Sequence, residues 1–591
     1  MQKPSLHNSR RLLVAVCLAS LCATPTDAGS TRVDDPIAEG WDTEAFAATA
    51  DRQLKAMGTT LAGSGHLSEE ALEALVSPLY DGGRLRPPRL VTVFDDSSIS
   101  VLRTSSKVEE DRSRFRGQSG FSRALEQLMK TFADTPAIRT EFKTVRVFQS
   151  AAGTRTRHLV SMSGVGLKGS VEVHMSWKIE WEEGARLAPP RILSVQLTDY
   201  EEVRFDGPTR TLFSDATTSV LARNPSFREQ ILRGPSYWLG RLEAGLGTDF
   251  MGHSGLAVGD VDGDGLDDLY VLQQGGLPNR LYIQNPDGSA SDRSEWSRLD
   301  WLDRSLSALI VDLDGDGDQD LVVGTTAGLL LLANDGKGRF EVRASQTSVR
   351  YGYSLAASDY DRDGDLDLYV SRYSPLTEDP VEAALDIPKP IPYHDAQNGA
   401  PNFLLRNDGE WLFTDATVET GMDDDNRRWS FAAAWEDFDN DGDPDLYVAN
   451  DFGRNCLYRN DGGRFTNVAA AAGVEDVGSG MSVAWADYDQ DGLMDLYVGN
   501  MFSSAGNRIA TQPRFQSEAD ESVRTMLLRL AKGNTLFRNL GDGRFAEVSD
   551  EAAVTMGRWA WSSVFADINN DGTQDLVVSN GYLTGENPDD L

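Results

Sequence analysis

The second half of this chain repeats one acidic segment six times, and this repetition constrains the fold more than any other feature. In each copy, aspartates occupy alternate positions ahead of a glycine, and a short apolar run follows directly. The copies begin at Asp260, Asp312, Asp359, Asp437, Asp487 and Asp567. Six copies in the same register indicate a repeated structural unit.

The spacing within each segment predicts a calcium-binding loop. Calcium takes roughly six to eight oxygen ligands, which alternate carboxylates and a main-chain carbonyl of a tight loop can supply. The glycine at position 6 of each segment allows the sharp turn. We therefore expect about six calcium ions, one per loop.

The predicted ligands stand at positions 1, 3, 5, 7 and 9 of each loop, with position 7 contributing its carbonyl. They are Asp260, Asp262, Asp264, Leu266 and Asp268; Asp312, Asp314, Asp316, Asp318 and Asp320; Asp359, Asp361, Asp363, Asp365 and Asp367; Asp437, Asp439, Asp441, Asp443 and Asp445; Asp487, Asp489, Asp491, Leu493 and Asp495; and Asp567, Asn569, Asp571, Thr573 and Asp575.

EF-hands share this spacing, but the residues after the glycine argue against that motif. An EF-hand needs a glutamate at position 12 and a helix on each side of the loop. Here position 12 is Val271, Val323, Val370, Val448, Val498 and Val578. A β-branched residue within an apolar run favours a buried strand, so each loop is expected to join two strands. Solvated Asp-Gly turns without an ion are the alternative.

The repeats also predict the architecture of residues 226–591. Small-residue strands precede the loops, and in several copies a third strand follows that ends in Arg-Asn, as in NCLYRN from Asn455. A fourth strand comes after a glycine-rich turn. Four short strands per unit, at a period near fifty residues, are typical of a β-propeller blade. We expect an all-β propeller of six blades, with a seventh, degenerate blade upstream of Asp260 as the alternative.

The last copy supplies only two strands before the chain ends. We expect the segment near residues 237–250 to complete that blade and close the ring, because propellers leave few exposed edges.

These repeats resemble FG-GAP or VCBS repeats, the calcium-loop blades of the integrin α-subunit propeller and of the cartilage acidic protein (ASPIC/UnbV) group. The resemblance covers roughly residues 250–591 and includes MFSSAGNRI from Met501 and GRWAWSSVFADINNDG from Gly557. It implies a calcium-stabilised propeller used for adhesion or ligand binding. The chain departs from those families because it has no UnbV-type segment and no integrin-like leg. The family does not fix a ligand.

The N-terminus predicts export. Lys3, Arg10 and Arg11 precede an apolar run from Leu12 to Leu21, and small residues follow. This pattern is typical of a signal peptide, here residues 1–28, and the mature protein is expected to be secreted or periplasmic, without a membrane span. Only Cys456 remains beyond it, in a third strand where it is expected to pack.

Residues 29–225 predict a smaller α+β domain. Phe46, Ala50 and Leu54 share a helical face behind Asp42 and Thr43, which are candidate caps. Further helices are expected near Ser68 and around residues 121–132. From 171 to 181 every odd position is apolar and every even position is polar, which predicts a half-buried antiparallel strand. Helices followed by a curved sheet loosely resemble the NTF2-like fold.

Charge and motifs exclude several functions. A formal charge of −36 argues against nucleic acid as a partner. Gly164, Gly166 and Gly169 spell a dinucleotide-binding pattern, but a strand and not a helix follows, so we interpret it as a hairpin turn. The chain contains no P-loop, nucleophile elbow or zinc-protease motif. His174 is expected on a solvated strand face.

Strand connectivity predicts where a ligand would bind. The calcium loops emerge at one end of the blades, whereas two long insertions, residues 374–400 and 501–532, and the blade-to-blade connections emerge at the other. Exposed aromatic and arginine side chains there would bind sugars or peptides. The alternative is that these pairs pack between blades. The candidates are Arg350, Tyr351, Arg428, Trp429, Asn450, Asp451, Asn500, Arg558, Trp559 and Asn580.

Two function classes follow. The first is a secreted, calcium-dependent adhesion or binding protein, not an enzyme, whose insertion-bearing face takes a glycan or protein ligand. The second is a polysaccharide-active enzyme of the lyase type on a calcium-stabilised propeller. A lyase needs converging basic and tyrosine side chains, for which Arg428, Arg558, Tyr393 and His394 are candidates.

Overall fold

The structure, a computed structural model, describes residues 41–96, 98–104, 114–150, 153–166, 169–182, 189–206, 213–234, 237–238, 240–243, 255–375 and 389–581. The predicted signal peptide and most of the predicted ring-closing segment lie outside these residues. The chain divides into two compact units. The first comprises residues 1–214 and 504–519, and the second comprises residues 215–503 and 520–591. The predicted domain limits at residues 28 and 225 remain predictions.

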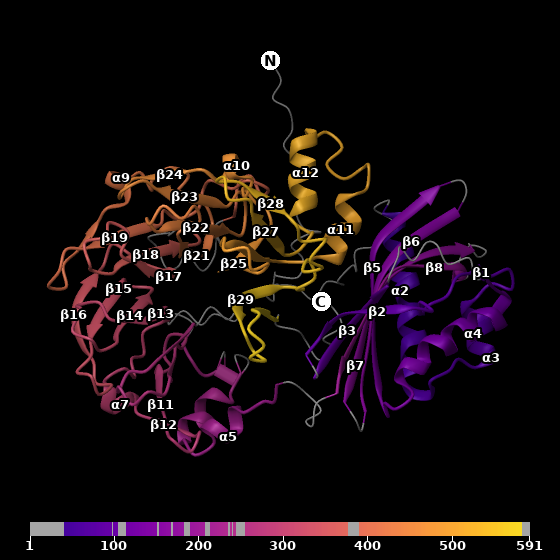
Figure 1. The fold of residues 1–591 in the computed structure, drawn as a ribbon, viewed down its shortest axis with the longest axis horizontal. Coiled ribbons are helices and arrows are strands. Elements are labelled where there is room, and N and C mark those ends of the chain that lie inside the picture. Colours follow the sequence, from indigo (N-terminus) through magenta and orange to yellow (C-terminus); the bar gives the residue numbers. More distant parts are fainter. Residues whose placement is uncertain are drawn as a thin grey trace. The chain divides into compact units, whose positions relative to one another are not determined.

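The first unit is an α+β fold built around one antiparallel sheet (Figure 1). The six strands follow the order β2-β3-β8-β7-β6-β5, and β1 pairs with β4 separately. The helices are α2 (Asp42–Ser64), α3 (Glu69–Leu75), α4 (Gly117–Met129), η2 (Lys130–Phe132) and α11 (Ser504–Ala510). The strands are β1 (Asp81–Gly82), β2 (Leu90–Asp95), β3 (Ile99–Thr104), β4 (Phe115–Arg116), β5 (Ile138–Ser150), β6 (Gly153–Val165), β7 (Ser170–Glu182) and β8 (Arg191–Phe205).

Amphipathic helices and alternating strands form the core of this unit. Leu54 of α2 and Phe121 of α4 pack with Trp177 of β7 in one buried cluster. The predicted alternation on β7 is confirmed, because every odd position from 171 to 181 is buried. The connection from β6 to β7 is a strand-to-strand hairpin, so the glycine pattern does not join a strand to a helix.

The predicted helix starts are right in one case and wrong in another. Ser68 caps α3, because its hydroxyl accepts a hydrogen bond from the amide of Ala71 at 3.2 Å. Asp42 and Thr43 do not cap α2, since the helix already begins at Asp42 and its N-cap is Trp41. Asp42 instead lies in the first turn, where a negative charge is favoured by the helix dipole.

The long insertion near residue 504 contributes a segment to the first unit, which the sequence did not predict. The Arg508 guanidinium forms an ion pair with Glu44 at 3.0 Å and donates to the Thr144 carbonyl at 2.7 Å. The guanidinium of Arg514 lies 4.4 Å from the ring centre of Trp41. Charge-assisted and cation–π contacts therefore hold residues 504–519 against α2 and β5.

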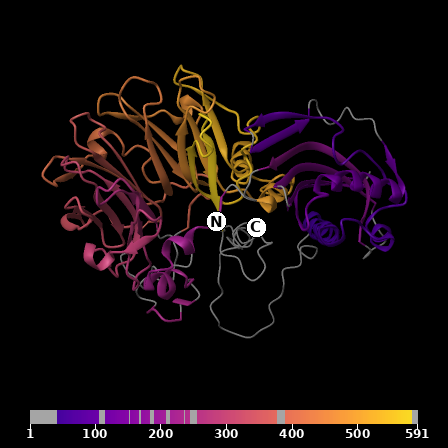
Figure 2. The ribbon, with the colours of Figure 1, turned by 60° about the horizontal axis from the view of Figure 1, so that its bottom comes forward.

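The second unit consists of antiparallel sheets arranged one after another (Figures 1 and 2). Five sheets have four strands, in the orders β9–β12, β13–β16, β17–β20, β21–β24 and β25–β28, and β29 pairs with β30 alone. The first strands of successive sheets contact one another from β9 through β29. These sheets are consistent with repeat blades.

The bounds of these strands follow the sequence pattern of small-residue strand, loop and apolar strand. The strands are β9 (Leu256–Gly259), β10 (Asp268–Val271), β11 (Arg280–Gln284), β12 (Ala290–Asp292), β13 (Ser305–Val311), β14 (Asp320–Thr325), β15 (Leu329–Ala333), β16 (Glu341–Gln346), β17 (Gly352–Ser358), β18 (Asp367–Arg372), β19 (Phe403–Asn407), β20 (Phe413–Asp415), β21 (Ser430–Glu436), β22 (Asp445–Asn450), β23 (Cys456–Asn460), β24 (Phe465–Asn467), β25 (Gly480–Ala486), β26 (Asp495–Asn500), β27 (Thr535–Asn539), β28 (Phe545–Glu547), β29 (Ala560–Ala566) and β30 (Asp575–Asn580). Short helices connect them: α5 (Thr217–Leu221), η3 (Phe227–Ile231), α7 (Ser294–Ser297), α9 (Thr417–Thr420), α10 (Ala469–Ala472) and α12 (Glu521–Arg529).

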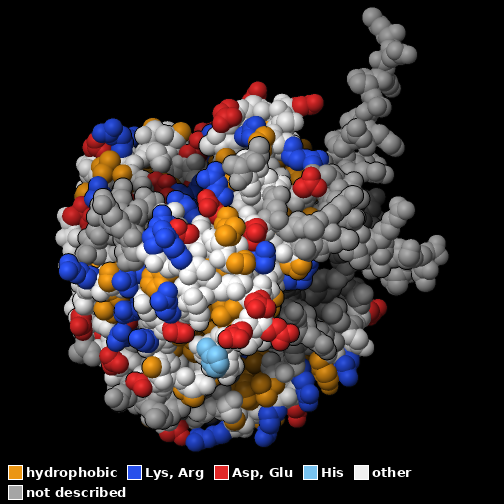
Figure 3. All heavy atoms as spheres, turned by 90° about the vertical axis from the view of Figure 1, so that its right-hand side faces the viewer, with side chains coloured by type: hydrophobic (Ala, Val, Ile, Leu, Met, Phe, Trp, Pro, Cys, Tyr) orange, Lys and Arg blue, Asp and Glu red, His pale blue; other side chains and the backbone are white. Residues whose placement is uncertain are grey.

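Cys456 is buried, as predicted. None of the helices in the described ranges combines the length and the apolar character needed to cross a membrane. Acidic and basic side chains are interspersed on the face shown in Figure 3.

Candidate metal sites and ligand-binding face

The six acidic loops share one backbone conformation. Positions 4 and 6 of every loop have positive φ, which turns the chain so sharply that alternate side chains face inward. Glycine occupies position 6 throughout, whereas position 4 is glycine in only two loops. The position 4 residues are Gly263, Gly315, Arg362, Asn440, Gln490 and Asn570. The repeat therefore enforces a loop shape that four of these residues do not favour on their own.

The first aspartate of each loop holds the turn together. In the fourth loop, the Asp437 carboxylate accepts hydrogen bonds from the amides of Asp441 at 3.0 Å and Gly442 at 2.9 Å. The same pair of bonds occurs at Asp260, Asp359, Asp487 and Asp567, and Asp312 accepts from Gly315 and Gly317. These bonds fix the loop before any ion binds.

In five of the six loops the ninth residue is a buried aspartate that begins the following strand, whereas Asp575 of the sixth loop is half-buried. Asp445 accepts hydrogen bonds from the amides of Phe438 at 3.2 Å and Asn460 at 2.7 Å. Burial, reinforced by neighbouring carboxylates, raises its pKa to about 8. The same causes raise the pKa of Asp367 to about 7 and of Asp268 to about 6. A cation bound beside these carboxylates would favour their ionised form and lower their pKa values.

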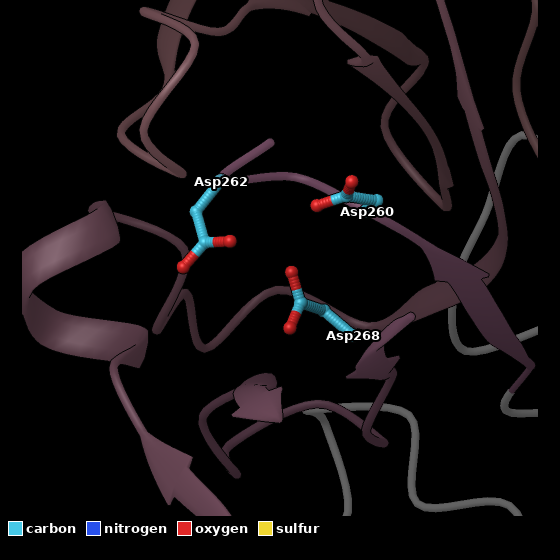
Figure 4. Close-up of side chains that lie close together, drawn as sticks. All are labelled: Asp260, Asp262 and Asp268. Atoms are coloured by element: carbon cyan, nitrogen blue, oxygen red, sulfur yellow. The ribbon is translucent and has the colours of Figure 1, made fainter. Parts of the chain in front are cut away.

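Aspartates at separate loop positions converge in five of the loops. Figure 4 shows the side chains of Asp260, Asp262 and Asp268 turned toward one another. In each group the ligand atoms lie within 4.8 Å of one another. The other groups are Asp312, Asp314 and Asp316; Asp359, Asp361 and Asp367; Asp437, Asp439 and Asp445; and Asp487, Asp489 and Asp495. Several sites in the repeats can therefore hold a metal ion.

The donor atoms fit a hard cation. Buried carboxylate oxygens of Asp262, Asp318 and Asp439 have no hydrogen-bond partner. An orphaned buried oxygen is costly unless a cation satisfies it. All side-chain donors are oxygens, which suits calcium and not zinc or copper. Such an ion would supply charge compensation to the loop. The sixth loop lacks an acidic triad of this kind because Asn569 stands at position 3.

In four blades, an asparagine at the end of the third strand or directly after it links that blade to the preceding loop, and this role was missed in the sequence. The Asn460 side-chain amide donates to the Tyr360 carbonyl at 2.8 Å, and Tyr360 is position 2 of the previous loop. Asn334, Asn407 and Asn539 make the equivalent bonds to Val261, Leu313 and Phe438. In the sequence, this asparagine is visible as the second residue of a repeated Arg-Asn pair, which is Ala-Asn in the second repeat.

The basic-aromatic pair of the fourth repeat is buried. Arg428 is 4% exposed and forms ion pairs with Asp395 at 2.6 Å and Asp425 at 2.9 Å. The Trp429 indole donates to Asn398 at 3.2 Å. Because Asp395 and Asn398 belong to the first insertion, the pair anchors that insertion. The pair is therefore packed and not exposed here, against the insertion.

The remaining predicted face residues divide by burial. Asn450, Asp451 and Asn500 are buried, and their side chains are hydrogen-bonded to residues of the connections between strands. Arg350 is exposed and lies 5.8 Å from the Tyr351 ring centre, whereas Arg558 and Trp559 are half-buried. Asn580 is exposed at the end of β30. Of the residues proposed for a lyase, Tyr393 packs on Phe452 with ring centres 5.0 Å apart.

Aromatic side chains that the sequence analysis did not single out converge at the same end of the blades. Five of the six first strands, all except β9, contain an irregularity that leaves one bulky residue unpaired: Leu306, Tyr353, Phe431, Met481 and Trp561. Each stands six positions before the first aspartate of its loop.

These bulged residues meet across the blades. The Phe431 ring centre lies 6.2 Å from that of Tyr353 and 5.9 Å from that of Trp561. Phe431 and Trp561 make this contact although β25 lies between their strands. All three rings are half-buried, so they form a partly accessible aromatic cluster.

Comparisons with solved structures find partial similarities. They include a protein from Kribbella flavida, an LEH-like epoxide hydrolase from M. tuberculosis and a phenazine biosynthesis-related protein from Pseudomonas aeruginosa. In that order, their sequence identities to this chain are 12%, 14% and 11%. The matches cover 26%, 26% and 27% of this chain, and 91%, 84% and 84% of the matched chains. The TM-scores of 0.19, 0.15 and 0.16 are too low to carry an argument, so the NTF2-like fold remains a prediction.

No curated protein matches the chain. A family model of the FG-GAP-like repeat matches residues 260–323, 312–370, 437–498 and 526–578. These matches span acidic loops and the strands that flank them. The second half of the chain therefore carries FG-GAP-like repeats.

Proposed function

We propose that this protein is a secreted, calcium-stabilised β-propeller that binds a glycan or a protein. The observation that carries the proposal is the recurrence of one aspartate cluster in successive FG-GAP-like repeats. Repetition in five blades favours a scaffold role for the ions over a catalytic one.

In this proposal, aspartates at positions 1, 3, 5 and 9 of each loop hold calcium. The ion neutralises carboxylates that burial alone would keep partly protonated. Asp445 then connects the ion to the Asn460 amide, and the Asn460 side chain connects to the preceding blade. Calcium would thereby stabilise the contact between neighbouring blades as well as its own loop.

The ligand would bind at the opposite end of the blades, over the aromatic cluster of Tyr353, Phe431 and Trp561. Half-buried aromatic rings offer apolar faces that stack on sugar rings or hold peptide side chains. Arg428 and Trp429 would act indirectly, because they hold the first insertion beside this surface.

The test is retention of the purified protein on a panel of polysaccharides in millimolar calcium, with new chain ends scored in the same samples. We expect retention that is lost in EDTA and weakened about tenfold in Phe431→Ala or Trp561→Ala, as for loss of a central aromatic contact. Leu412→Ala is the matched control, because Leu412 is 61% exposed at the calcium-loop end of β19 and β20.

The outcomes separate the candidate functions. Retention that survives EDTA or both aromatic variants would contradict the proposed calcium dependence or the proposed surface. New reducing or unsaturated ends would instead identify the lyase-type enzyme. If no polysaccharide is retained, protein ligands are tested with the same three variants.

A further inference from the structure

The first unit contains a polar cavity that the calcium-binding proposal does not use. Its volume is about 340 Å³, within the range of small-molecule sites. Arg84 and Arg86 reach it from the segment between β1 and β2, Lys130 from the end of α4, and Arg204 from β8. Pro87, Pro88, Gln127 and Thr131 complete the lining.

The charge of this cavity contrasts with that of the chain. Residues 215–591 hold 29 basic and 65 acidic residues and so account for the whole formal charge of −36. Residues 1–214 hold 27 of each and are neutral. All four titratable side chains that line the cavity are nevertheless cationic. Cations placed close together repel one another, and an anionic ligand would relieve that repulsion.

One buried carboxylate compensates only part of this charge. Glu202 is fully buried and accepts hydrogen bonds from Arg86 at 3.1 Å, Arg204 at 2.8 Å and the Tyr200 hydroxyl at 2.8 Å. Burial alone would raise its pKa, but the bonds from Arg204 and Tyr200 and the charge of Arg86 bring the pKa below its usual value. Glu202 is therefore ionised and orients two arginines.

Basic side chains predominate at the cavity. Among the described residues, four cations line it and the carboxylate of Glu202 contacts two of them. The C-terminal end of α4 adds only about half a negative charge nearby. Arg84 is further positioned by a hydrogen bond to Gln127 at 2.9 Å. The guanidinium groups are thus held in place before any ligand arrives, which lowers the entropic cost of binding.

We infer that Arg84, Arg86, Lys130 and Arg204 form a binding site for a small organic oxyanion, with carboxylate or phosphate as the recognised group. Guanidinium groups match the geometry of both, because each presents two N–H donors to two oxygens. The cavity volume suits a ligand of metabolite size. Glu202 serves as a positioning residue that does not contact the ligand.

The experiment is calorimetric titration of the full-length, calcium-loaded protein with succinate and, separately, with glycerol 3-phosphate. Both probes bind calcium weakly, so the metal sites remain filled. The variants are Arg84→Gln and Lys130→Gln, and the matched control is Arg123→Gln, an exposed arginine on the same helix as Gln127. We expect the dissociation constant to rise about tenfold or more in the first two and to stay unchanged in the control.

Each result decides the inference. Binding of succinate alone, or of glycerol 3-phosphate alone, supports it and identifies the recognised group. Absence of binding by both probes at millimolar concentration overturns it, as does binding that both variants leave unchanged. If Arg84→Gln fails to fold, Lys130→Gln decides, since the Lys130 side chain is exposed. The site lies in the first unit, so this result is independent of calcium binding by the repeats.

Discussion

At the residue scale, the repeats depend on asparagines that complete the hydrogen bonds of buried carbonyls. Asn460 is fully buried, and its amide donates to the carbonyls of Tyr360 at 2.8 Å and Pro444 at 3.1 Å. A buried carbonyl without a donor costs about 1–3 kcal/mol. The Asn460 carbonyl oxygen also accepts from the Gly463 amide at 2.7 Å, and the only other amino acid with this pair of groups, glutamine, is one methylene longer.

We expect Asn460→Ala to lower the free energy of unfolding by about 2 kcal/mol, because two buried carbonyls lose their donor. Urea denaturation in millimolar calcium would measure the change. Thr466 is exposed on the adjacent strand β24, so Thr466→Ala should leave the urea midpoint unchanged. Equal midpoints for Asn460→Ala and the wild-type protein would contradict the linking role.

A second residue-scale feature is a buried hydrogen-bonded chain in the first unit. The Trp181 indole donates to Thr156 at 2.7 Å, and Thr156 contacts Nε2 of His158 at 2.6 Å. The other ring nitrogen lies 3.0 Å from the Thr144 hydroxyl, which donates to Asp51. Since Thr156 already accepts from Trp181 and Thr144 donates to Asp51, His158 carries its proton on Nδ1.

This arrangement makes the first unit sensitive to acid. Burial lowers the pKa of His158 from 6.5 to about 3, so His158 is protonated at a lower pH in the folded state than in the unfolded state. The stability that neutral His158 contributes is present above pH 6.5 and is lost as the pH falls toward 3. We expect a loss of a few kcal/mol over this range, reduced in His158→Gln.

Thermal melts of both proteins between pH 7 and pH 4 would measure this difference. His174→Gln is the control, because His174 is half-exposed on the same sheet. A pH dependence that His158→Gln does not reduce would show that other groups cause the acid sensitivity.

At the scale of the element, the sixth loop differs from the fourth in charge but not in backbone. Asn570 and Asn440 have the same φ of 59° at position 4, and both loops have glycine at position 6. Position 3 is Asn569 in the sixth loop and Asp439 in the fourth. Calcium affinity in such loops depends on the number of charged ligands, so the sixth loop should bind calcium more weakly.

A reciprocal exchange tests this. We expect Asp439→Asn to weaken calcium binding by the fourth loop about tenfold. Asn569→Asp should strengthen calcium binding by the sixth loop by a similar factor, since each exchange changes one charged ligand. Calcium titration by calorimetry would follow both. If neither exchange changes the calcium affinity of a loop, the loops are solvated turns and not metal sites.

The sequence predicted these elements well because their signals are local. Alternate aspartates, a glycine at position 6 and a valine at position 12 lie within one loop and one strand, and the structure shows the loops between strands such as β21 and β22. The burial of Arg428 depends on Asp395, 33 residues away. The bulge at Phe431 depends on pairing with β22. Such features need contacts that no short segment reveals.

At the scale of the whole molecule, two cores in one chain should unfold in separate steps. Only the second unit contains the acidic loops, while Arg508 and Glu44 belong to the first. If the sites bind calcium at about 10⁻⁴ to 10⁻³ M, as extracellular modules do, each would add about 0.4 to 1.4 kcal/mol at about 1 mM calcium. Several sites together rival the net stability of a domain.

We expect scanning calorimetry to give two transitions. EDTA should lower the midpoint temperature of only one of them, that of the second unit, by several degrees. Arg508→Ala should lower the other, because it leaves the half-buried Glu44 carboxylate without its partner. Glu518→Ala, an exposed change in the same segment, is the control. A single transition that both EDTA and Arg508→Ala shift would contradict independent unfolding.

The asparagine links run in one direction along the chain. Asn334, Asn407, Asn460 and Asn539 each donate to a loop that lies earlier in the sequence. During synthesis, the acceptor loop of each link has therefore left the ribosome before its donor. Each sheet from β13–β16 to β25–β28 can therefore pack, in order of translation, onto a sheet that has already been made.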